Sequence, residues 1–481
     1  MIGTTGLVLN EPFLWERGRP GRVGFSLPGR DVEEAPLDPR YAGEGPDFPD
    51  LSEVEVVRHY TRLSTWNFGV DTGMYPLGSC TMKYNPKINE RMASLPGFAQ
   101  AHPIMPFEVS QGALRLIYDL EAYLCEITGM AAVSVQPAAG SQGELAGMLI
   151  FAAYHRRKGT PRTKVIIPDT AHGTNPASAA LCGFKAVPVV TGKDGILTPD
   201  VVAAVMDEET AGIMMTNPNT LGLFEEKVVD ICDIVHGKGG LVYGDGANMN
   251  AIMGYADMSR IGIDVLHLNL HKTLSTPHGG GGPGAGPVCV NRKLEPFLPV
   301  PRVLKDGDRY LLSNDYPDSI GKLHAFYGNM GVLIRAYSYI LSLGAELKTV
   351  SEFAVLSANY LKERLRPLLH LPFDKPCMHE CVFTDKDLEG FNVSTLDVAK
   401  RLIDFGFHPP TIYFPLVVQG AIMIEPTESE SKETLDQFVE AMEAIVREAE
   451  SDPLILKQAP TRTKVRRLDE TGAARNPVLK G

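Results

Sequence analysis

The stretch His267-Leu268-Asn269-Leu270-His271-Lys272-Thr273-Leu274 connects an apolar run to a glycine-dense segment, Pro277-His278-Gly279-Gly280-Gly281-Gly282-Pro283-Gly284. A lysine just past an apolar strand suits nucleophilic chemistry, because that use of lysine requires an amine partly shielded from water. The glycines let the backbone approach a flat cofactor without interference from Cβ atoms. A surface lysine beside a flexible loop would give the same pattern. Lys272 is therefore a candidate for covalent attachment of a cofactor, with this second interpretation still open.

Short β-rich runs alternate with helical stretches around this lysine. We expect strands at 164–168, 186–190, 212–216, 240–243, 264–268 and 287–290, with helices at 198–206 and 227–236 between them. Because the runs are apolar throughout, they predict an α/β fold with a mostly parallel sheet covered by helices on both faces. A helix over 110–128, with Ser110 as its N-cap, is expected before the sheet.

The chain is expected to divide into four parts. Residues 1–75 are rich in Pro, Gly and charge, and they predict an arm that wraps over a larger body. Residues 76–330 form the large sheet domain, and residues 331–450 form a smaller α+β domain that opens with a long helix reaching Leu369. Residues 451–481 are a polar, basic tail.

The composition is that of an ordinary globular protein of 481 residues, with 22% charged residues and a net charge of −12. An acidic balance argues against a nucleic-acid partner. No apolar run approaches the roughly 20 residues of a membrane span, and the first residues lack the pattern of a signal peptide. Seven scattered cysteines fit reduced thiols. We therefore expect a cytoplasmic protein with no membrane partner.

An acidic residue, Asp245 in Val242-Tyr243-Gly244-Asp245-Gly246-Ala247-Asn248, follows an expected strand. The carboxyl ends of strands are where open α/β sheets bind ligands. Asp245 precedes Lys272 by 27 residues, which leaves room for one more helix and strand. A carboxylate here can keep a pyridine nitrogen protonated, which makes the ring an electron sink. Asp-Gly is also common in turns, so the motif is ambiguous alone.

Two segments further upstream complete the pattern. His172 comes directly after an expected strand and could stack on a cofactor ring, although a structural histidine fits the same position. The run Gln136-Pro137-Ala138-Ala139-Gly140-Ser141-Gln142-Gly143-Glu144 opens a helix whose first N–H groups could bind a phosphate. The order of phosphate loop, histidine, acid and lysine is the layout of pyridoxal-phosphate enzymes of fold type I, the aspartate aminotransferase-like fold.

Several sequence blocks resemble the glycine cleavage system P-protein. They are Gly78-Ser79-Cys80-Thr81-Met82-Lys83-Tyr84-Asn85-Pro86, the helix-opening run at 136–144, Ala171-His172-Gly173-Thr174-Asn175-Pro176, Thr216-Asn217-Pro218-Asn219-Thr220-Leu221-Gly222, Asn269-Leu270-His271-Lys272-Thr273 and Glu425-Pro426-Thr427-Glu428-Ser429. The resemblance runs from the arm to the tail, where it includes 465–470. The chain has half the length of the single-chain form, so it looks like subunit 2 of the two-subunit bacterial form.

The resemblance implies a glycine dehydrogenase (aminomethyl-transferring), a decarboxylase that depends on pyridoxal 5'-phosphate. Such an enzyme removes CO₂ from glycine and transfers the aminomethyl group to the lipoyl arm of H-protein, which is an oxidoreduction because the lipoyl disulfide is reduced. The implied partners are glycine, lipoylated H-protein and subunit 1, in an α2β2 heterotetramer. The missing half leads us to expect dependence on subunit 1.

The resemblance also implies roles for the residues around the cofactor. Lys272 would hold pyridoxal 5'-phosphate as a Schiff base, and Asp245 would pair with the ring nitrogen. His172 and Ala247 would cover the two ring faces. The remaining positions are Gly140, Ser141 and Gln142 at the phosphate, His271 beside the phosphate or Lys272, and Thr216 and Asn217 at a strand end near the ring.

Other candidates keep two interpretations each. Cys377-Met378-His379-Glu380-Cys381 is similar to a metal-binding run but has no second ligand pair, so we expect no metal site. Cys80 is either a lipoyl-facing or redox-sensitive thiol, or a buried structural cysteine. Lys83 and Arg302 either meet the substrate carboxylate or the lipoyl arm, or are surface cations. The basic residues Arg462, Lys464, Arg466 and Arg467 either dock a partner or form a solvated tail.

Two other functions would fit parts of the pattern. Another lyase or a desulfurase of fold type I is the nearest rival, but a desulfurase needs a mobile cysteine after the lysine, and Cys289 falls inside an expected strand. A scaffold subunit without cofactor is the alternative from another class. The presence of Lys272, Asp245 and His172 together argues against it.

Overall fold

This computed structural model describes residues 11–45, 47–278 and 284–479 of the chain. The described residues form two compact units, one from residues up to Thr72 together with those from Arg462 onward, and one within Gly73–Thr461. The first residues, on which the missing signal peptide was predicted, and Gly279–Pro283 of the glycine-dense segment lie outside the described residues. None of the helices in the described part of the chain has the length and apolar character needed to cross a membrane.

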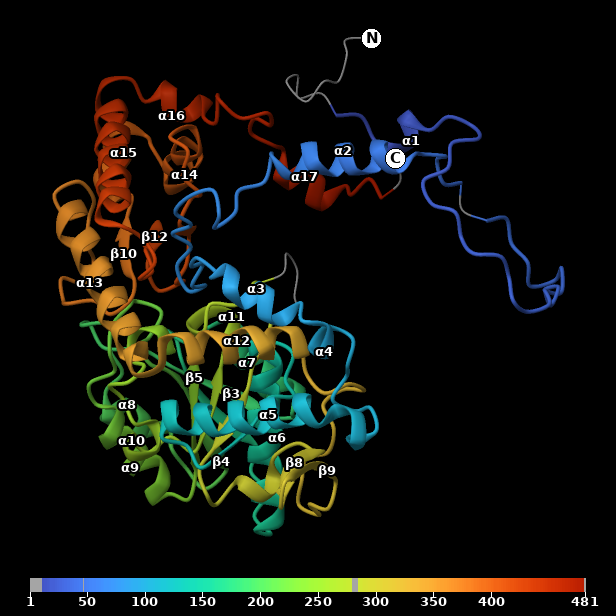
Figure 1. Cartoon of the computed structure of the whole chain (residues 1–481). Coiled ribbons are helices and arrows are strands. Elements are labelled where there is room, and N and C mark those ends of the chain that lie inside the picture. The colour runs from blue at the N-terminus through green and yellow to red at the C-terminus, as the bar shows by residue number, and fades with distance from the viewer. Residues whose placement is uncertain (1–10, 46, 279–283, 480–481) are drawn as a thin grey trace. The chain divides into compact units, whose positions relative to one another are not determined.

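A seven-stranded sheet forms the centre of the larger unit (Figure 1), in the order β1-β7-β6-β5-β4-β2-β3. Its strands are β1 Ala132–Ser134, β2 Lys164–Pro168, β3 Lys185–Val189, β4 Thr210–Thr216, β5 Leu241–Gly246, β6 Val265–Leu268 and β7 Val288–Val290. Strands β2 to β6 pair in parallel, whereas β7 is antiparallel to both β6 and β1. The predicted mostly parallel sheet is confirmed, and all six predicted strands are present within three residues at each end.

Helices cover this sheet. They are α5 Phe107–Thr128, α6 Gly140–Arg157, α7 Thr174–Leu181, α8 Pro199–Val205, α9 Val228–Gly237, α10 Met258–Ile261, α11 Leu270–Thr273 and α12 Met330–Leu343, with α3 Lys87–Ala93 and α4 Pro96–Ala99 before them and 3₁₀ turns η1 Met249–Ala251 and η2 Glu295–Phe297. The prediction of Ser110 as an N-cap is wrong, because α5 begins earlier, after Pro106, and the Ser110 hydroxyl donates back to the Pro106 carbonyl at 3.3 Å. Glycine lets α6 lie close to the sheet, since a Cβ at Gly147 would meet the Tyr243 ring at 2.5 Å.

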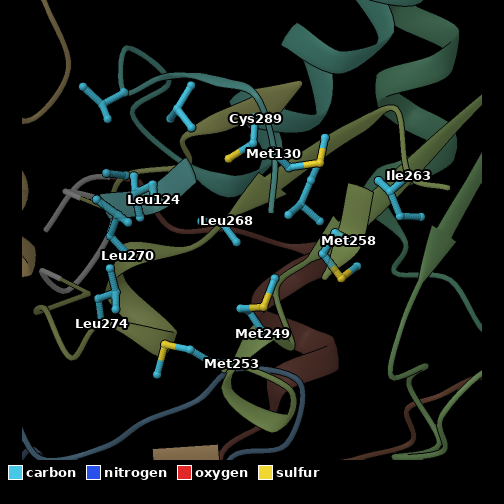
Figure 2. Close-up of a cluster of buried hydrophobic side chains, with 14 of the residues drawn as sticks. Leu124, Met130, Met249, Met253, Met258, Ile263, Leu268, Leu270, Leu274 and Cys289 are labelled. Carbon is cyan, nitrogen blue, oxygen red and sulfur yellow. The ribbon is translucent and has the colours of Figure 1, made fainter. Parts of the chain in front are cut away.

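A buried apolar cluster fixes the segment that carries Lys272 (Figure 2). Leu268, Leu270 and Leu274 flank the lysine, and each has at most 4% of its surface exposed. They pack in one cluster with Met249 and other side chains of the neighbouring turn. Burial of such side chains stabilises a fold by about 2 kcal/mol each. The short helix α11 is therefore anchored on both sides of the lysine.

A smaller C-terminal α+β domain follows. Its elements are η3 Gly344–Glu346, α13 Leu347–Leu365, β10 Cys381–Thr384, η4 Lys386–Phe391, α14 Thr395–Asp404, β11 Thr411–Ile412, β12 Ala421–Ile424, α15 Lys432–Ser451 and α16 Leu454–Gln458. Its antiparallel sheet has the order β10-β12-β11. The predicted long helix to Leu369 is interrupted, because α12 ends at Leu343 and the next residue, Gly344, has a positive φ of +53°. The hairpin β8 Arg302–Asp306 with β9 Arg309–Ser313 was not predicted.

The smaller unit combines the arm and the tail. It contains α1 Leu14–Arg17, α2 Glu53–Ser64 and α17 Glu470–Arg475. Glu11 accepts hydrogen bonds from Arg62 and His59, and the contact with Arg62 above all lowers the pKa of Glu11 to about 2. In the tail, the Lys464 ammonium lies 5.8 Å from the centre of the Trp66 ring. The exact boundaries of the four predicted parts stay a prediction.

Candidate active site

Three polar residues stand side by side at the carboxyl ends of neighbouring strands. Thr216 of β4 pairs with Asp245 of β5, and Asp245 pairs with His267 of β6. The chain then continues from β6 into α11, which carries Lys272. Parallel strands place their carboxyl ends along one edge of the sheet, where ligands bind. The predicted acid and the predicted lysine therefore lie at the same buried edge of the sheet.

Asp245 is a buried carboxylate with several donors. Its oxygens accept from the backbone N–H of Ala247 at 3.0 Å and from the amide of Asn175 at 3.1 Å, and His267 Nε2 lies at 3.5 Å. Burial opposes ionisation, but His267 and these hydrogen bonds outweigh it, with a contribution from the charge of Lys272, and the pKa of Asp245 is lowered. Asp245 is therefore a fixed negative charge at the strand edge.

His267 and Tyr243 support this carboxylate, and the sequence reasoning missed both. The Tyr243 hydroxyl lies 2.5 Å from His267 Nδ1. Since Nε2 faces Asp245, Nδ1 is the acceptor and Tyr243 is the donor. Burial lowers the pKa of His267, and the charge of Asp245 opposes this effect. The available signal was the two-residue spacing between Tyr243 and Asp245, which places both on the same face of β5.

His172 follows β2 and is half-buried beside the site. Its Nδ1 lies 2.9 Å from the Thr174 hydroxyl, and Thr174 donates to Glu144 of α6 at 2.7 Å. The ring also makes an edge contact with Phe414, with centroids 5.9 Å apart. Burial lowers the pKa of His172, and burial together with the charge of Asp245 raises the pKa of Glu144 to about 7. Glu144 thus fixes the histidine through Thr174, a role that its sequence block did not reveal.

The start of α6 forms the proposed phosphate end of the site. Ala139 is an extended N-cap, so the first N–H groups of the helix have no partner within the helix. A Cβ at Gly140 would lie 2.4 Å from Asn269 Oδ1, which places this turn against the start of α11. Ser141 is exposed, whereas the Gln142 side chain accepts from the Ala138 N–H at 2.6 Å. The backbone and Ser141 are therefore the donors best suited to an anion.

Lys272 is 7% exposed, and its Nζ donates to the Ser79 carbonyl at 2.9 Å. Its positive charge contributes to the pKa values of both Asp245 and His172, so the three predicted residues lie within electrostatic reach of one another. The adjacent His271 accepts from the Ala285 N–H at 3.2 Å. Burial lowers the pKa of His271 to about 3, so this side chain is neutral.

Asn217 and Thr216, the other two predicted residues, differ in the hydrogen bonds of their side chains. The Asn217 side chain accepts from the Glu225 N–H at 3.0 Å and so stabilises its own loop. The Thr216 hydroxyl is buried without a partner among the described residues. The same holds for four further polar atoms of the surrounding segments, Asn175 Oδ1, Asn269 Oδ1, Thr273 Oγ1 and Thr276 Oγ1. Buried polar groups in proteins are normally hydrogen-bonded. This set, with the carboxylate and the lysine, fits a small polar ligand such as pyridoxal phosphate.

A second cluster lies in the small domain. Within the described residues, the ligand atoms of His379, Glu380 and Glu425 lie within 4.8 Å of one another, as do those of Glu144, Asp245 and His267. Cys377 and Cys381 of the metal-like run are buried free thiols outside the cluster. The sequence pointed to the run but not to Glu425, which joins it from β12.

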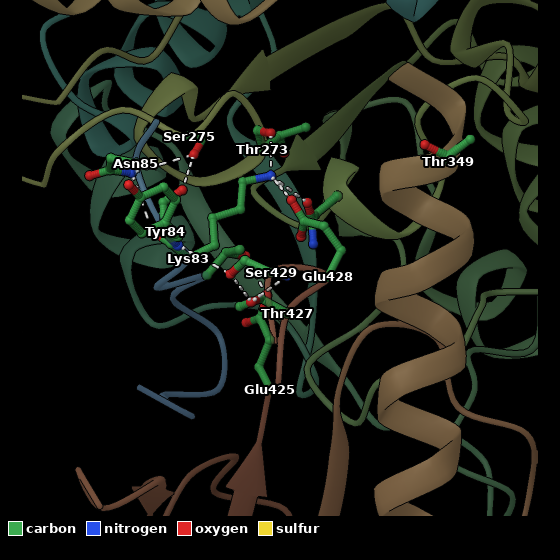
Figure 3. Close-up of polar contacts among 12 residues, drawn as sticks. Lys83, Tyr84, Asn85, Thr273, Ser275, Thr349, Glu425, Thr427, Glu428 and Ser429 are labelled. Carbon is green, nitrogen blue, oxygen red and sulfur yellow. Dashed lines mark hydrogen bonds and ion pairs between the residues drawn. The ribbon is translucent and has the colours of Figure 1, made fainter. Parts of the chain in front are cut away.

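Lys83 is buried, and its Nζ donates to Thr273 O at 2.7 Å and Asn250 Oδ1 at 3.1 Å and pairs with Glu428 at 2.6 Å (Figure 3). The surface-cation interpretation of Lys83 is therefore wrong. Arg302 is half-buried and pairs with Glu295 at 3.1 Å.

Two of the predicted candidates are cysteines. Cys80 is half-buried, with Sγ 3.7 Å from His278 Nδ1. Cys289 is buried within β7, as expected.

Comparison with known proteins gives consistent relatives. The family model "Glycine dehydrogenase, C-terminal domain" matches residues 350–461, and "Aminotransferase class-V" matches residues 142–299. The chain is 57% identical over 474 residues to the probable glycine dehydrogenase (decarboxylating) subunit 2 of Caldanaerobacter subterraneus subsp. tengcongensis, covering 97% of this chain and 98% of the relative. The protein of the same name from Halalkalibacterium halodurans is 55% identical, with 98% of each chain covered.

Solved structures agree on the fold. Glycine decarboxylase (P-protein) of the glycine cleavage system, in inhibitor-bound form, matches with a TM-score of 0.73 at 20% identity, covering 85% of this chain and 93% of that one. A NIFS-like protein matches with a TM-score of 0.61 at 16% identity, covering 78% of this chain and 99% of that one. These likenesses, together with the seven-stranded sheet, confirm the predicted fold class.

Proposed function

The chain belongs to the family of glycine dehydrogenase (decarboxylating) subunit 2, and we propose that it is the catalytic, pyridoxal-phosphate-binding subunit of a glycine decarboxylase. The observation that carries this proposal is the strand edge at which the buried Asp245 of β5 lies beside His267 of β6, the strand that leads into α11 with the buried Lys272. When bound, pyridoxal phosphate supplies an electron sink for the bond that loses CO₂. Glycine decarboxylation needs this chemistry.

The residues of this chain would hold the cofactor as follows. The Lys272 amine would bond to it covalently, and Asp245, anionic and buried, would keep its ring nitrogen protonated. His172 would cover one ring face, and Ala247 would cover the other. The phosphate would lie at the start of α6, on the amides of Gly140 and Ser141 and the Ser141 hydroxyl, with the Gln142 side chain beside them.

Other groups would orient the substrate and exclude water. The Thr216 hydroxyl is a buried donor with no partner in the described part of the chain, and it suits the ring edge. His271, neutral in this environment, would support the phosphate end or Lys272 as an acceptor. A site this enclosed keeps water away from the reacting carbon and fixes the orientation of the scissile bond.

The partners belong to the same proposal. The relatives are named as subunit 2, which supports a subunit 1 partner and, with the resemblance to the P-protein, an α2β2 assembly. The acceptor would be the lipoyl arm of H-protein, whose disulfide takes up the aminomethyl group and the electrons. A cytoplasmic location is supported by the seven cysteines, all of which are free thiols.

A spectroscopic experiment tests the site. We expect the purified chain to acquire a visible absorption band with pyridoxal phosphate, and borohydride to fix the cofactor on Lys272. The variant Lys272→Ala should lose both signals, whereas Lys305→Ala, at an exposed lysine of β8, should keep them. A wild-type chain that never binds the cofactor would refute the proposal.

An exchange experiment tests the substrate and the partners. Glycine–CO₂ exchange should require lipoylated H-protein and should rise strongly when subunit 1 is co-expressed. Full exchange by this chain without subunit 1 would show that the assembly is not needed.

A further inference from the structure

Ser79 connects Lys272 to the acidic cluster of the small domain. Its carbonyl accepts from Lys272 Nζ at 2.9 Å, and its own N–H donates to Glu380 Oε2 at 2.7 Å. Ser79 has a φ of +61°, in the left-handed region that residues with a Cβ seldom adopt. The surroundings must hold the backbone in this conformation. The hydrogen bond from Ser79 to Glu380 is one such restraint.

The residues before and after Ser79 both contact the antiparallel sheet of the small domain or the residue that follows it. The Gly78 carbonyl accepts from the Thr411 hydroxyl of β11 at 2.7 Å, and a Cβ at Gly78 would lie 2.1 Å from Met423 Cγ of β12. The Thr81 hydroxyl donates to Glu425. The segment 77–81 therefore lies firmly against the sheet. Its one carbonyl that faces the active-site lysine is held at a defined place.

The contact with Glu380 needs an acceptor oxygen and does not need a negative charge. Glu380 is completely buried, and burial together with the nearby Glu425 raises its pKa well above the usual range. Burial raises the pKa of Glu425 to about 7. A protonated carboxyl still offers a carbonyl-type oxygen to the Ser79 N–H. The geometry of Glu380 thus matters more than its charge.

We propose that the Ser79 carbonyl is the hydrogen-bond acceptor that holds the Lys272 ammonium group whenever Lys272 is not bonded to the cofactor. Glu380 is the positioning residue that keeps this carbonyl in place. The inference rests on the proposed function, in which the Lys272 amine would bond covalently to the cofactor. A buried ammonium group needs an acceptor in place of water. A fixed acceptor keeps the Lys272 amine close to the cofactor site and oriented to bond to the cofactor again.

Labelling of the cofactor-free full-length chain tests the contact between Lys272 and the Ser79 carbonyl. Reductive methylation of Lys272 is followed by peptide mass spectrometry, with the exposed Lys305 as internal reference. Glu380→Asp keeps the acid but is one methylene too short to reach the Ser79 N–H, and we expect Lys272 to be labelled about fivefold faster, the effect of one lost hydrogen bond. Glu380→Gln keeps the reach and an acceptor oxygen but cannot ionise, and it should show the wild-type rate.

Hydrogen exchange at the Ser79 amide provides a second readout. The amide should exchange about fivefold faster in Glu380→Asp and at the wild-type rate in Glu380→Gln. The matched pair Glu430→Asp and Glu430→Gln, at a half-buried carboxyl of the same domain, should change neither readout. Equal behaviour of the two Glu380 variants, or wild-type labelling in Glu380→Asp, would overturn the proposal. Both measurements use no cofactor or glycine, so failure of the proposed function would leave them unaffected.

Discussion

The larger unit contains two buried clusters of the same composition, each with two carboxyl groups and one histidine. The first consists of Glu144, Asp245 and His267 in the large domain, and the second of His379, Glu380 and Glu425 in the small domain. Both lie within electrostatic reach of Lys272, whose charge contributes to the pKa values of Asp245 and Glu380. The pKa of Asp245 is nevertheless lowered, whereas the pKa values of Glu144, Glu380 and Glu425 are raised.

Asp245 differs from the two glutamates of the second cluster in the number of donors that it meets. Asp245 has a backbone N–H, an amide and a histidine, and its pKa is lowered despite complete burial. In the second cluster, both nitrogens of His379 and one oxygen each of Glu380 and Glu425 have no partner among the described residues. Burial therefore dominates there and raises the pKa of both glutamates. Composition alone does not decide whether a buried acid is charged.

The largest expected effect is at the charged acid. Asp245→Asn keeps the shape of the side chain but cannot hold a ring nitrogen protonated, so glycine–CO₂ exchange should fall by about 10³-fold, within the range of a lost acid–base group. The visible band of the bound cofactor should persist, because Lys272 is intact. Both quantities are measured on the assembled enzyme.

A matched variant is Asp169→Asn, at a carboxylate directly after β2 that accepts from the Thr191 N–H at 3.0 Å. It removes a strand-end charge outside the cluster and should change exchange by less than about threefold. If Asp245→Asn kept a tenth of the wild-type rate, the distinction between the two clusters would fail.

The second effect concerns the cluster of His379, Glu380 and Glu425. Through the raised pKa of Glu425, the folded protein should become less stable as the pH rises. The pKa of Glu425 is about 7 in the folded chain and near 4.5 in the unfolded chain, so between these values the folded chain keeps a proton that the unfolded chain releases. Raising the pH from 5 to 8 should therefore destabilise the cofactor-free protein through this group by about 2 to 3 kcal/mol. Glu425→Gln, which retains an oxygen for Thr81, should abolish that loss.

Urea unfolding at pH 5 and pH 8 measures this difference. Glu208→Gln, at an exposed position, is the control and should follow the wild type. A wild-type pH dependence in Glu425→Gln would mean that Glu425 ionises as freely as a surface carboxyl.

The sequence predicted the first cluster better than the second, for physical reasons. Continuous apolar runs identified the parallel strands, and Asp245 and Lys272 follow from them because parallel strands end at one edge. His267 was missed because β6 is buried on both faces, so alternation gives no sign of which side chains face the site. The three-residue strand β1 was not predicted, although β7, which has the same length, was.

The second cluster depends on contacts between distant segments. Ser79 and Glu380 are separated by 301 residues, and Thr81 and Glu425 by 344. Local spacing carries no information about such pairs. The run around His379 was noticed only for its similarity to metal ligands. Its role as a support for the segment 77–81 follows from tertiary packing alone.

The smallest expected effect concerns the hydrogen bond from Tyr243 to His267, which supports Asp245 without changing its charge. Tyr243→Phe removes the donor to His267 Nδ1, which leaves that nitrogen buried without a partner and weakens the orientation of Nε2 toward Asp245. The lost hydrogen bond should lower glycine–CO₂ exchange by about tenfold, with the cofactor still bound. Tyr327→Phe is a matched variant, because this buried tyrosine donates to Glu121 at 3.4 Å instead. It should leave exchange within about twofold of the wild type. An equal loss in both variants would mean that the effect comes from general destabilisation, and Asp245 would then keep its charge without help from Tyr243.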